Sequence, residues 1–469
     1  MMEKDVFGKV QGLVAARVPV HMSGIGGVGM AGLALLLQSR GVPVSGCDLQ
    51  PGPLVEALRA KGISVDVGHV ALQEGAAAGW VIRSAAVQTS RPDIQSALNR
   101  NVPVFRRGEV LPVLVALASQ SIIIAGTHGK TTTATLAAHL LSSLDPSWCI
   151  GGVSEAFPLP GGGGSGPLVV EADESDGTLA LYAPSIAVVT NVDFDHMEHF
   201  ASVEAFEACF STFLGQARDG VIYCADDARA SMLARASGRR VLGYGFGASA
   251  AIRGFLGKDG VLRIAYPDGV EIRLRLPGRL PGVHNALNML GALSICYEMG
   301  LPASVWGDLV GALRLPARRF ELLAEHGGIQ VISDYAHHPA EITVLVQMVR
   351  SLHNGRVLVV FQPHRYTRTA ALRGMFPLAF TGIDFLVLTP VYAASEDPVP
   401  GGTTEDLLRE FETCCVPYDT VFACTLEDAA QNILERLAPG DMVLIIGAGD
   451  VEKAGRIVGD AIRGLYGNG

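Results

Sequence analysis

The chain has 469 residues, of which 49% are hydrophobic and 17% are charged. One hydrophobic core rarely extends over so many residues, so the length predicts about three globular domains. The formal net charge of −10 argues against a broad nucleic-acid-binding surface, which requires clustered lysine and arginine. No run of 18 or more apolar residues occurs, so we expect no membrane span.

The eight cysteines lie scattered through apolar segments and form no CxxC pair. That distribution is typical of buried free thiols. The first twenty residues contain no apolar stretch as long as the core of a signal peptide. Together these features predict a cytoplasmic protein.

Apolar segments alternate with helical segments in the first hundred residues. Residues 18–24 and 42–49 read as strands, and residues 29–41 as a helix that ends at Gly41. Strands that alternate with helices predict a parallel, doubly wound, Rossmann-like sheet. Residues 101–114 are expected to form a closing strand and the connection to the next domain.

A second α/β unit begins near Ser121. Its expected strands are residues 121–127, 167–173, 185–192 and 219–226. Residues 240–280 alternate apolar with polar side chains, which predicts antiparallel strands, and a helix follows. The run "PLPGGGGSGP" at 158–167 is expected to be a flexible surface loop. We therefore predict a central domain with a mostly parallel sheet.

The strand–helix pattern restarts around Pro316. The expected strands there are residues 329–336, 355–363, 384–391 and 441–449. They predict a C-terminal Rossmann-like domain. The expected domain boundaries are thus 1–114, 115–315 and 316–469.

The stretch "IIIAGTHGKTTTATLAAHLL" places a glycine-lysine-threonine turn between an apolar strand and a helix. A helix N-terminus presents free N–H groups and a partial positive charge, which attract phosphate. Gly126 and Gly129 would let the backbone curl around the anion, and Lys130 would reach the β- and γ-phosphates. Thr131 or Thr132 would offer a hydroxyl to Mg²⁺. The turn predicts a P-loop ATPase-type site; a structural strand–helix turn is the alternative.

An earlier turn, "GIGGVG" at residues 24–29, has the spacing G-x-G-x-x-G, and Asp48 ends the next strand. This pattern is typical of dinucleotide-binding domains. By itself it leaves open NAD, another nucleotide diphosphate, or a plain turn. Two phosphate-binding turns on separate domains suggest that one holds a nucleotide-tagged substrate and the other the ATP that activates it.

Acidic, histidine and asparagine side chains follow the strands of the central domain. Glu171 comes directly after an apolar strand, and a carboxylate beside a P-loop commonly holds Mg²⁺. His196, in "TNVDFDHMEHF", is a second candidate metal ligand. Asn285 and Asn288 lie one helical turn apart and could bind a purine edge, although capping or solvated roles are favoured on spacing alone.

These stretches together resemble the Mur ligase family, the ATP-dependent enzymes that build the peptidoglycan stem peptide. The resemblance rests on "GTHGKTT", "EADESD", "TNVDFDHME" and "HNALN", which occur in the family's order. The motifs "ARRFE", "DYAHHPAEI", "QPHRYTRT" and "VYAASE" narrow it to the branch that attaches L-alanine to UDP-N-acetylmuramate. The resemblance covers essentially the whole chain.

The resemblance implies a role for each motif residue. The UDP-substrate is expected at Gly24, Ile25, Gly26, Gly27, Val28, Gly29, Asp48, His69, Ser84, Arg365 and Arg368. ATP is expected at Gly126, Thr127, His128, Gly129, Lys130, Thr131, Thr132, Asn285, Asn288, Arg319 and Asp334. Mg²⁺ is expected at Thr131, Glu171 and His196, and L-alanine at Tyr335 and His337. The residues expected to be catalytic are Lys130, Glu171, His196 and His337.

The implied reaction first transfers the γ-phosphate of ATP to the lactyl carboxylate, which gives an acyl phosphate. The amine of L-alanine then attacks, and a tetrahedral intermediate collapses to the amide and phosphate. Lys130 and Mg²⁺ would neutralise the anions that the first step brings together. His337 or His338 is the candidate base for the amine, with helix capping as the other role for His338. Because three ligands must meet, we also expect domain closure.

Three alternatives remain at this level. A branch of the same family attaches a whole tripeptide to the same UDP-sugar. An NAD-dependent oxidoreductase would use "GIGGVG" and Asp48 but gives "GTHGKTT" no role. A P-loop regulatory ATPase would explain Lys130 but not "DYAHHP" or "QPHRYTRT". The chain also has Arg83 where the family often has serine, and either a monomer or a homodimer is compatible with the sequence.

Overall fold

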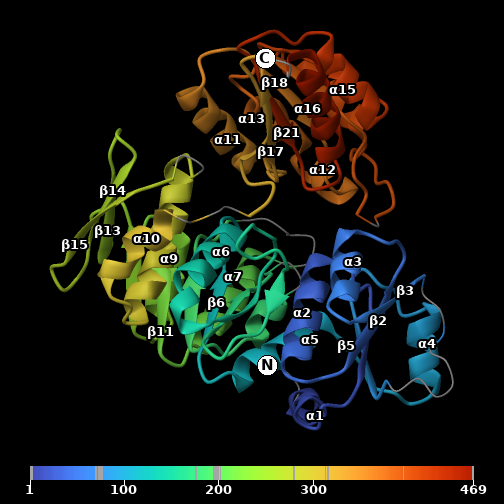
Figure 1. Ribbon diagram of the computed structural model, residues 1–469, viewed down its shortest axis with the longest axis vertical. Coiled ribbons are helices and arrows are strands. Elements are labelled where there is room, and N and C mark those ends of the chain that lie inside the picture. The colour runs from blue at the N-terminus through green and yellow to red at the C-terminus, as the bar shows by residue number, and fades with distance from the viewer. Residues whose placement is uncertain are drawn as a thin grey trace. The chain divides into compact units, whose positions relative to one another are not determined.

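The computed structural model describes residues 4–68, 71, 78–174, 177–193, 200, 202–277, 280–311, 313, 316–394 and 396–466. The chain divides into two compact units, Met1–Pro316 and Ala317–Gly469. Within the described residues, two sheets belong to the first unit and one to the second (Figure 1). No described helix combines the length and the apolar character that crossing a membrane would require.

The first sheet is parallel throughout and has the strand order β3-β2-β1-β4-β5. Its strands are β1 (Val20–Ser23), β2 (Val44–Asp48), β3 (Ser64–Val67), β4 (Trp80–Arg83) and β5 (Val104–Arg106). The strand order reverses between β1 and β4, and the glycine-rich turn at 24–29 leaves β1 at that point. Ligands of open α/β sheets bind at such a reversal. The predicted Rossmann-like sheet is confirmed.

The helices of this region are α1 (Lys4–Ala15), α2 (Val28–Ser39), α3 (Pro53–Ala60), α4 (Pro92–Asn99) and α5 (Arg107–Leu117). Proline at the first position starts α3 and α4, where a missing N–H costs nothing. The expected boundary between residues 114 and 115 falls inside α5. The chain therefore enters the second sheet through a continuous helix whose central residues are buried.

The central sheet has the strand order β15-β14-β13-β12-β11-β10-β6-β9-β7-β8. Its strands are β6 (Ser121–Ala125), β7 (Ser147–Cys149), β8 (Gly161–Gly162), β9 (Leu168–Glu171), β10 (Ile186–Val189), β11 (Gly220–Cys224), β12 (Val241–Gly245), β13 (Ile252–Leu256), β14 (Val261–Ala265) and β15 (Glu271–Arg275). The strands β13, β12, β11, β10, β6, β9 and β7, which are successive neighbours in the sheet, pair in parallel. β13, β14 and β15 pair antiparallel, at one end of the sheet in Figure 1, so the mixed sheet is confirmed.

The helices of this sheet are α6 (Lys130–Leu140), η1 (Ser142–Leu144), η2 (Thr178–Leu181), α7 (Val203–Gly215), α8 (Ala228–Ala236), α9 (Val283–Glu298), η3 (Ala303–Val305) and α10 (Trp306–Gly311). One apolar cluster joins the first sheet to one face of the central sheet, through residues such as Leu33, Leu36 and Ile123. A second cluster fills the other face beneath α6 and α9.

The prediction of a flexible surface loop for the glycine run at 158–167 is wrong. Gly161 and Gly162 form β8, which pairs antiparallel with β7. A Cβ on Gly161 would lie 2.3 Å from the carbonyl oxygen of Gly32 in α2. The missing side chains therefore allow this segment to pack directly on the helix that follows the first glycine-rich turn.

The sheet of the second unit has the strand order β16-β17-β21-β18-β19-β20. Its elements are β16 (Glu321–His326), β17 (Ile329–Asp334), α11 (Pro339–Leu352), β18 (Val357–Phe361), α12 (Tyr366–Leu372), η4 (Arg373–Met375), α13 (Phe376–Ala379), β19 (Phe385–Leu388), α14 (Thr404–Thr413), β20 (Asp419–Phe422), α15 (Leu426–Leu434), β21 (Met442–Ile446) and α16 (Glu452–Tyr466). Only the β16–β17 pair is antiparallel in the described sheet. Apolar clusters cover both faces, and the predicted C-terminal α/β domain is confirmed.

Candidate functional site

The turn between β6 and α6 has a backbone that only glycine fits. Gly126 has a φ of +131°, and Gly129, the N-cap of α6, has a φ of +81°. A Cβ on Gly126 would lie 2.2 Å from Thr190 Oγ1, and one on Gly129 would lie 2.4 Å from Asn288 Oδ1. Larger residues would therefore be strained and would collide with their neighbours. The turn leads into the N-terminus of α6, whose N–H groups suit a phosphate.

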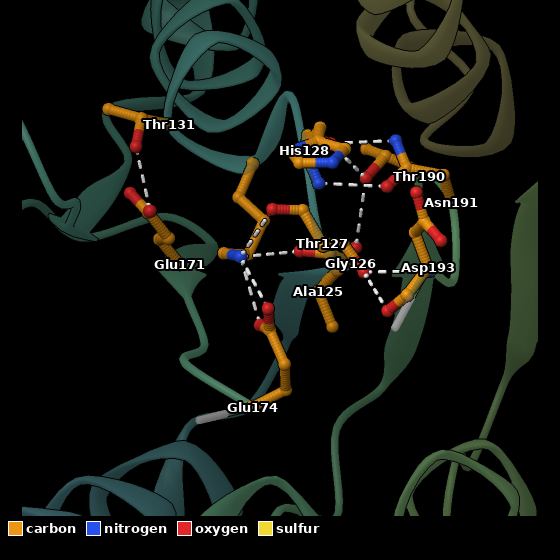
Figure 2. Close-up of polar contacts among 11 residues, drawn as sticks. Ala125, Gly126, Thr127, His128, Thr131, Glu171, Glu174, Thr190, Asn191 and Asp193 are labelled. Atoms are coloured by element: carbon orange, nitrogen blue, oxygen red, sulfur yellow. Dashed lines mark hydrogen bonds and ion pairs between the residues drawn. The ribbon is translucent and has the colours of Figure 1, made fainter. Parts of the chain in front are cut away.

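Lys130 is held at the start of α6 by one carboxylate and two carbonyl groups (Figure 2). Its Nζ lies 2.9 Å from Glu174 Oε1 and 3.1 Å from the Thr127 carbonyl oxygen, and it also donates to the Gly126 carbonyl. Burial alone would lower the pKa of Lys130, but the carboxylates of Glu174 and Asp173 outweigh it, so the pKa is raised. The amine is therefore cationic where a nucleotide phosphate would lie.

Glu171 lies at the carboxyl end of β9, next to β6. The Thr131 hydroxyl donates to Glu171 Oε1 at 2.7 Å (Figure 2). The Gly151 N–H donates to Glu171 Oε2 at 2.6 Å. Thr132, the alternative hydroxyl, is only 4% exposed. The geometry therefore favours Thr131 as the partner of Glu171. Together they offer the hard oxygen donors that Mg²⁺ prefers.

The segment that follows β10 holds the turn at residues 126–130, called the phosphate loop below, in its conformation (Figure 2). The His128 N–H donates to Asn191 Oδ1 at 2.8 Å, and Asn191 Nδ2 and Thr190 Oγ1 both donate to the His128 carbonyl. The Thr127 hydroxyl donates to the Asp193 carbonyl at 3.0 Å. "TNVD" therefore fixes the shape of the turn. The candidate ligand His196, three residues further on, lies outside the described residues.

Asn285 and Asn288 take different positions on α9. Asn288 Oδ1 accepts from the Thr133 hydroxyl at 3.4 Å and lies against Gly129. Asn285 is buried and its Nδ2 donates to the Pro281 carbonyl at 2.8 Å. The structure thus brings Asn288 to the phosphate loop, whereas Asn285 fastens the start of its own helix.

The first glycine-rich turn is held by β2 and by Asp48. The N–H groups of Gly24 and Ile25 both donate to the Cys47 carbonyl, at 2.9 and 3.1 Å. The Gly26 N–H donates to Asp48 Oδ2 at 2.8 Å. Asp48 therefore orders the turn from within, in addition to any contact with a ribose. Gly27 is the N-cap of α2, and residues other than glycine can also adopt its φ of −69°.

Two further side chains lie against this turn. A Cβ on Gly24 would lie 3.1 Å from Ser84 Cβ, which places the predicted Ser84 beside the glycines. A Cβ on Gly29 would lie 3.0 Å from Arg107 Nη1, so a guanidinium reaches the N-terminus of α2. Arg107 is a candidate phosphate ligand that the sequence analysis missed; the paired arginines of "FRRGEV" were the only signal. Arg83 instead donates to the Val87 carbonyl, and His69 lies outside the described residues.

In the second unit, Asp334 ends β17 and organises the preceding loop. It accepts from the N–H groups of Phe320 and Ala336, both at 2.8 Å. Burial raises the pKa of Asp334, and Arg319 offsets only part of that effect. The guanidinium of Arg319 lies 5.1 Å from the centre of the Tyr335 ring. The predicted residues Arg319, Asp334 and Tyr335 are thus neighbours.

The two adjacent histidines differ in role. His338 is the N-cap of α11, and its Nδ1 accepts from the Ala340 N–H at 3.3 Å, so the capping role is confirmed. His337 Nδ1 lies 3.1 Å from the Tyr335 carbonyl oxygen and 3.5 Å from Glu341 Oε2. The geometry therefore favours His337 over His338 as a group that can act on a substrate.

His364, in "QPHRYTRT", lies beside His337, and the sequence analysis assigned it no role. Its ring centre lies 5.8 Å from that of His337 and stacks on Tyr392 at 5.6 Å. Burial, then repulsion from Arg368 and from His337 when it is protonated, lower the pKa of His364 to about 3. Its Nδ1 lies 3.4 Å from Arg368 Nη1. The ring is therefore neutral at physiological pH.

The two predicted arginines of this motif are both engaged. Arg368 is only 7% exposed, beside His364. Arg365 Nε lies 2.5 Å from Glu396 Oε1, and Glu396 also accepts from the Thr367 hydroxyl at 2.8 Å. The Arg365–Glu396 pair must open, or be bridged, if Arg365 is to bind a phosphate or carboxylate.

Three family models match successive parts of the chain. Residues 19–118 match the "Mur ligase family, catalytic domain", residues 164–296 the "Mur ligase middle domain", and residues 318–449 the "Mur ligase, glutamate ligase domain". A UDP-N-acetylmuramate–L-alanine ligase of Renibacterium salmoninarum is 39% identical over 456 residues, which cover 94% of this chain and 96% of the relative. The one of Kineococcus radiotolerans is 41% identical over 457 residues, which cover 93% of this chain and 94% of the relative.

Solved structures share the fold. A UDP-N-acetylmuramate-alanine ligase from Thermotoga maritima superposes with a TM-score of 0.80 at 25% identity, over 96% of this chain and all of that one. A murein peptide ligase from Psychrobacter arcticus superposes with a TM-score of 0.73 at 21% identity, over 95% of this chain and 98% of that one. From these matches over nearly its whole length, we conclude that the chain belongs to the Mur ligase family.

Proposed function

We propose that this protein joins L-alanine to the lactyl carboxylate of UDP-N-acetylmuramate and couples that step to the conversion of ATP to ADP and phosphate. The observation that carries this proposal is the 39% identity to a UDP-N-acetylmuramate–L-alanine ligase over 94% of the chain. The two glycine-rich turns support it, because the reaction needs one site for the diphosphate of the carrier and another for the triphosphate.

The phosphate loop and Lys130 bind the phosphates of ATP in this proposal. The Lys130–Glu174 ion pair keeps the amine charged, and Asn288 faces the same loop. Thr131 and Glu171, 2.7 Å apart, would hold Mg²⁺ together with His196. Mg²⁺ supplies positive charge that stabilises the phosphate oxygens during transfer. Asn285, Arg319 and Asp334 complete the proposed ATP site.

The first glycine-rich turn binds the diphosphate of the UDP-sugar. The turn leads into the N-terminus of α2, whose partial positive charge favours an anion. Arg107 adds a fixed positive charge next to Gly29, and Ser84 lies against Gly24. His69 completes this set. Arg365 and Arg368 hold the carboxylate or a phosphate from the C-terminal domain.

Tyr335 and His337 bind L-alanine, and His337 accepts a proton from its ammonium group. The contacts of His337 with the Tyr335 carbonyl and Glu341 orient the ring. The neutral ring of His364 beside it adds no competing charge. The free amine then attacks the acyl phosphate. In this proposal the N–H groups of the phosphate loop and the cationic Lys130 stabilise the tetrahedral intermediate.

We propose further that residues 1–114, 115–315 and 316–469 carry the UDP-sugar, ATP and amino-acid sites, and that the domains close on their ligands in the cytoplasm. Small-angle scattering with and without all three ligands tests closure. A decrease in the radius of gyration is expected on adding ATP, Mg²⁺, UDP-N-acetylmuramate and L-alanine. An unchanged curve would contradict it.

The deciding experiment is phosphate release from ATP in the presence of Mg²⁺ and UDP-N-acetylmuramate. Acceptors are L-alanine, glycine, L-serine and the L-Ala-D-Glu-diaminopimelate tripeptide, and the product is identified by mass. We expect release that requires both the UDP-sugar and L-alanine. Release with the tripeptide alone would assign the attachment of a tripeptide to the UDP-sugar, and release that does not depend on the UDP-sugar would refute the ligase proposal.

A further inference from the structure

Three buried side chains from different elements meet beside the first glycine-rich turn. His21 lies on β1, Cys47 on β2, and Asp93 in the first turn of α4. Their exposed fractions are 7%, 1% and 0%. One nitrogen, sulfur or oxygen atom from each lies within 4.8 Å of the other two. The proposed binding of UDP, ATP and alanine uses none of these side chains.

The sheet register explains why the three meet. His21 is opposite Ser45, and Ser23 is opposite Cys47, so all four side chains share the face of the sheet that α4 covers. The Cys47 thiol donates to Asp93 Oδ2 at 3.4 Å. His21 Nδ1 lies 3.3 Å from Ser45 Oγ. On this face Val81, Val87, Ile94 and Ala97 form one apolar cluster. Arg83 lies opposite Ser23 in the sheet register, so its side chain shares this face.

We propose that His21, Cys47 and Asp93 bind one soft divalent transition-metal ion, for which Zn²⁺ is the best fit. Imidazole, thiolate and carboxylate are the donors that Zn²⁺ prefers, at about 2.0–2.3 Å in a tetrahedral arrangement. Such bonds place the donor atoms about 3.3–3.8 Å apart. A contraction of about 1 Å in the widest separation therefore brings the three atoms into range. Thiolate is a poor ligand for Mg²⁺, so the site is distinct from that of Thr131 and Glu171.

The charges favour a bound ion. On binding, the Cys47 thiol loses its proton to solvent as the sulfur–metal bond forms. The divalent ion, the thiolate, the Asp93 carboxylate and a neutral His21 then sum to zero charge. Burial and Asp93 raise the pKa of the Cys47 thiol to about 12, so the ion must displace the proton.

Two serines supply the remaining contacts of the site. Metal-bound histidine usually has its second ring nitrogen held by an oxygen, and Ser45 Oγ is in place to do so. Ser23 Oγ, 4.0 Å from Cys47 Sγ and fully buried, offers an oxygen for a fourth position. Because the Cys47 carbonyl holds Gly24 and Ile25, the bound ion would tie β1, β2 and α4 together under the diphosphate-binding turn.

Titration of the full chain with Co²⁺ tests the proposal. A Co²⁺–thiolate bond gives an intense charge-transfer band in the near ultraviolet, which oxygen and nitrogen ligands do not give. The protein is first treated with a chelator and a phosphine reductant, and excess Mg²⁺ is then added to occupy oxygen-donor sites. We expect one equivalent of Co²⁺ to produce the band and one equivalent of Zn²⁺ to abolish it. A wild-type protein without the band overturns the proposal, whatever the variants do.

Matched variants identify the ligands. Cys47→Ala and Asp93→Asn are expected to remove and to weaken the band, respectively. Cys149→Ala is the matched control, because Cys149, like Cys47, is a buried thiol that interacts electrostatically with a carboxylate, here that of Glu171. The band should survive in that variant, and a band that survives in Cys47→Ala assigns the metal elsewhere.

Thermal unfolding gives a second readout that does not depend on turnover. Zn²⁺ should raise the unfolding midpoint of the wild-type protein and leave that of Cys47→Ala unchanged, since only the folded site binds the ion. An equal rise in both proteins would contradict the assignment. Ligase turnover is measured in parallel, and its loss or retention bears on the proposed function and not on the metal site.

Discussion

Lys130 and Glu174 form an ion pair across the phosphate loop, with Nζ 2.9 Å from the carboxylate. The side chains are 15% and 1% exposed, so water screens the pair only weakly. In the proposed ATP site, a phosphate oxygen would replace Glu174 beside Lys130. Nucleotide binding would then exchange one anionic partner of Lys130 for another, and this exchange would link the stability of the loop to ligand binding.

Glu174→Gln is therefore expected to lower stability and to increase the stabilisation that nucleotide provides. Losing one partner of a buried pair costs about 3–5 kcal/mol, and the glutamine amide oxygen should recover part of it. The unfolding midpoint should fall without ligand and should rise more with ATP analogue than in the wild type. Glu56→Gln, in an exposed pair with Arg59, should change neither value by a measurable amount. Equal ATP-induced shifts in wild type and Glu174→Gln would contradict the exchange.

Gly126→Ala and Gly129→Ala should abolish nucleotide binding. Both positions have a positive φ and lack room for a Cβ, so the turn must distort. Positive-φ strain in a non-glycine residue costs about 1–3 kcal/mol before the collisions are counted. Gly12→Ala, in α1 with no atom within 4 Å of the added Cβ, is the matched control and should stabilise by about 0.5–1 kcal/mol. Calorimetric titration with an ATP analogue and urea unfolding measure the two effects.

Glu171→Gln should raise the Mg²⁺ concentration that half-saturates turnover. The amide keeps the contact with Thr131 but loses the charge that holds a divalent cation. We expect an increase of about tenfold or more, since a charged hydrogen-bonding ligand contributes about 1.5–3 kcal/mol. Glu155→Gln, on an exposed stretch before the same strand, should leave the Mg²⁺ dependence unchanged. A normal Mg²⁺ titration for Glu171→Gln would remove this residue from the metal site.

Arg107→Ala should weaken binding of the UDP-sugar and spare ATP. The guanidinium lies against Gly29, at the N-terminus of α2. Loss of one charge-assisted contact to a phosphate corresponds to about a tenfold to hundredfold rise in KM for UDP-N-acetylmuramate. The neighbouring Arg106 is exposed and pairs with Glu109, so Arg106→Ala is the control. Similar KM values for the two variants would show that Arg107 does not contact the substrate.

His364 should make the second unit sensitive to acid. Its pKa is about 3 in the folded chain and about 6.5 when unfolded, so the unfolded state binds more protons between these values. Stability is thus fully present above pH ~6.5 and is lost as the pH falls towards 3. His364→Gln should flatten this part of the stability curve relative to wild type, whereas His326→Gln, at the end of β16, should not. Urea unfolding between pH 4 and about 7.5 measures the difference; parallel wild-type and His364→Gln curves would contradict it.

Several features could be predicted from local sequence alone. Apolar strands followed by glycine and a helix predicted β1–α2 and β6–α6, because strand and helix periodicity are properties of adjacent residues. The capping role of His338 followed from "HHPAE" for the same reason, and the hydrogen bond from the Ala340 N–H to His338 Nδ1 confirms it. The error at Gly161 had the opposite cause. Its conformation depends on close contact with Gly32, more than a hundred residues away, which glycine content alone does not reveal.

The sequence by itself determined the α/β class, the two glycine-rich turns and the motifs that lead to the Mur ligase family, since these are short segments whose chemistry is local. Only the tertiary structure decided which side chains meet. It paired Lys130 with Glu174 and Thr131 with Glu171, brought Arg107 to Gly29, and gathered His21, Cys47 and Asp93 under one helix. The physical reason is that strand order and register bring distant segments to one edge or face of a sheet, and no local pattern encodes that order.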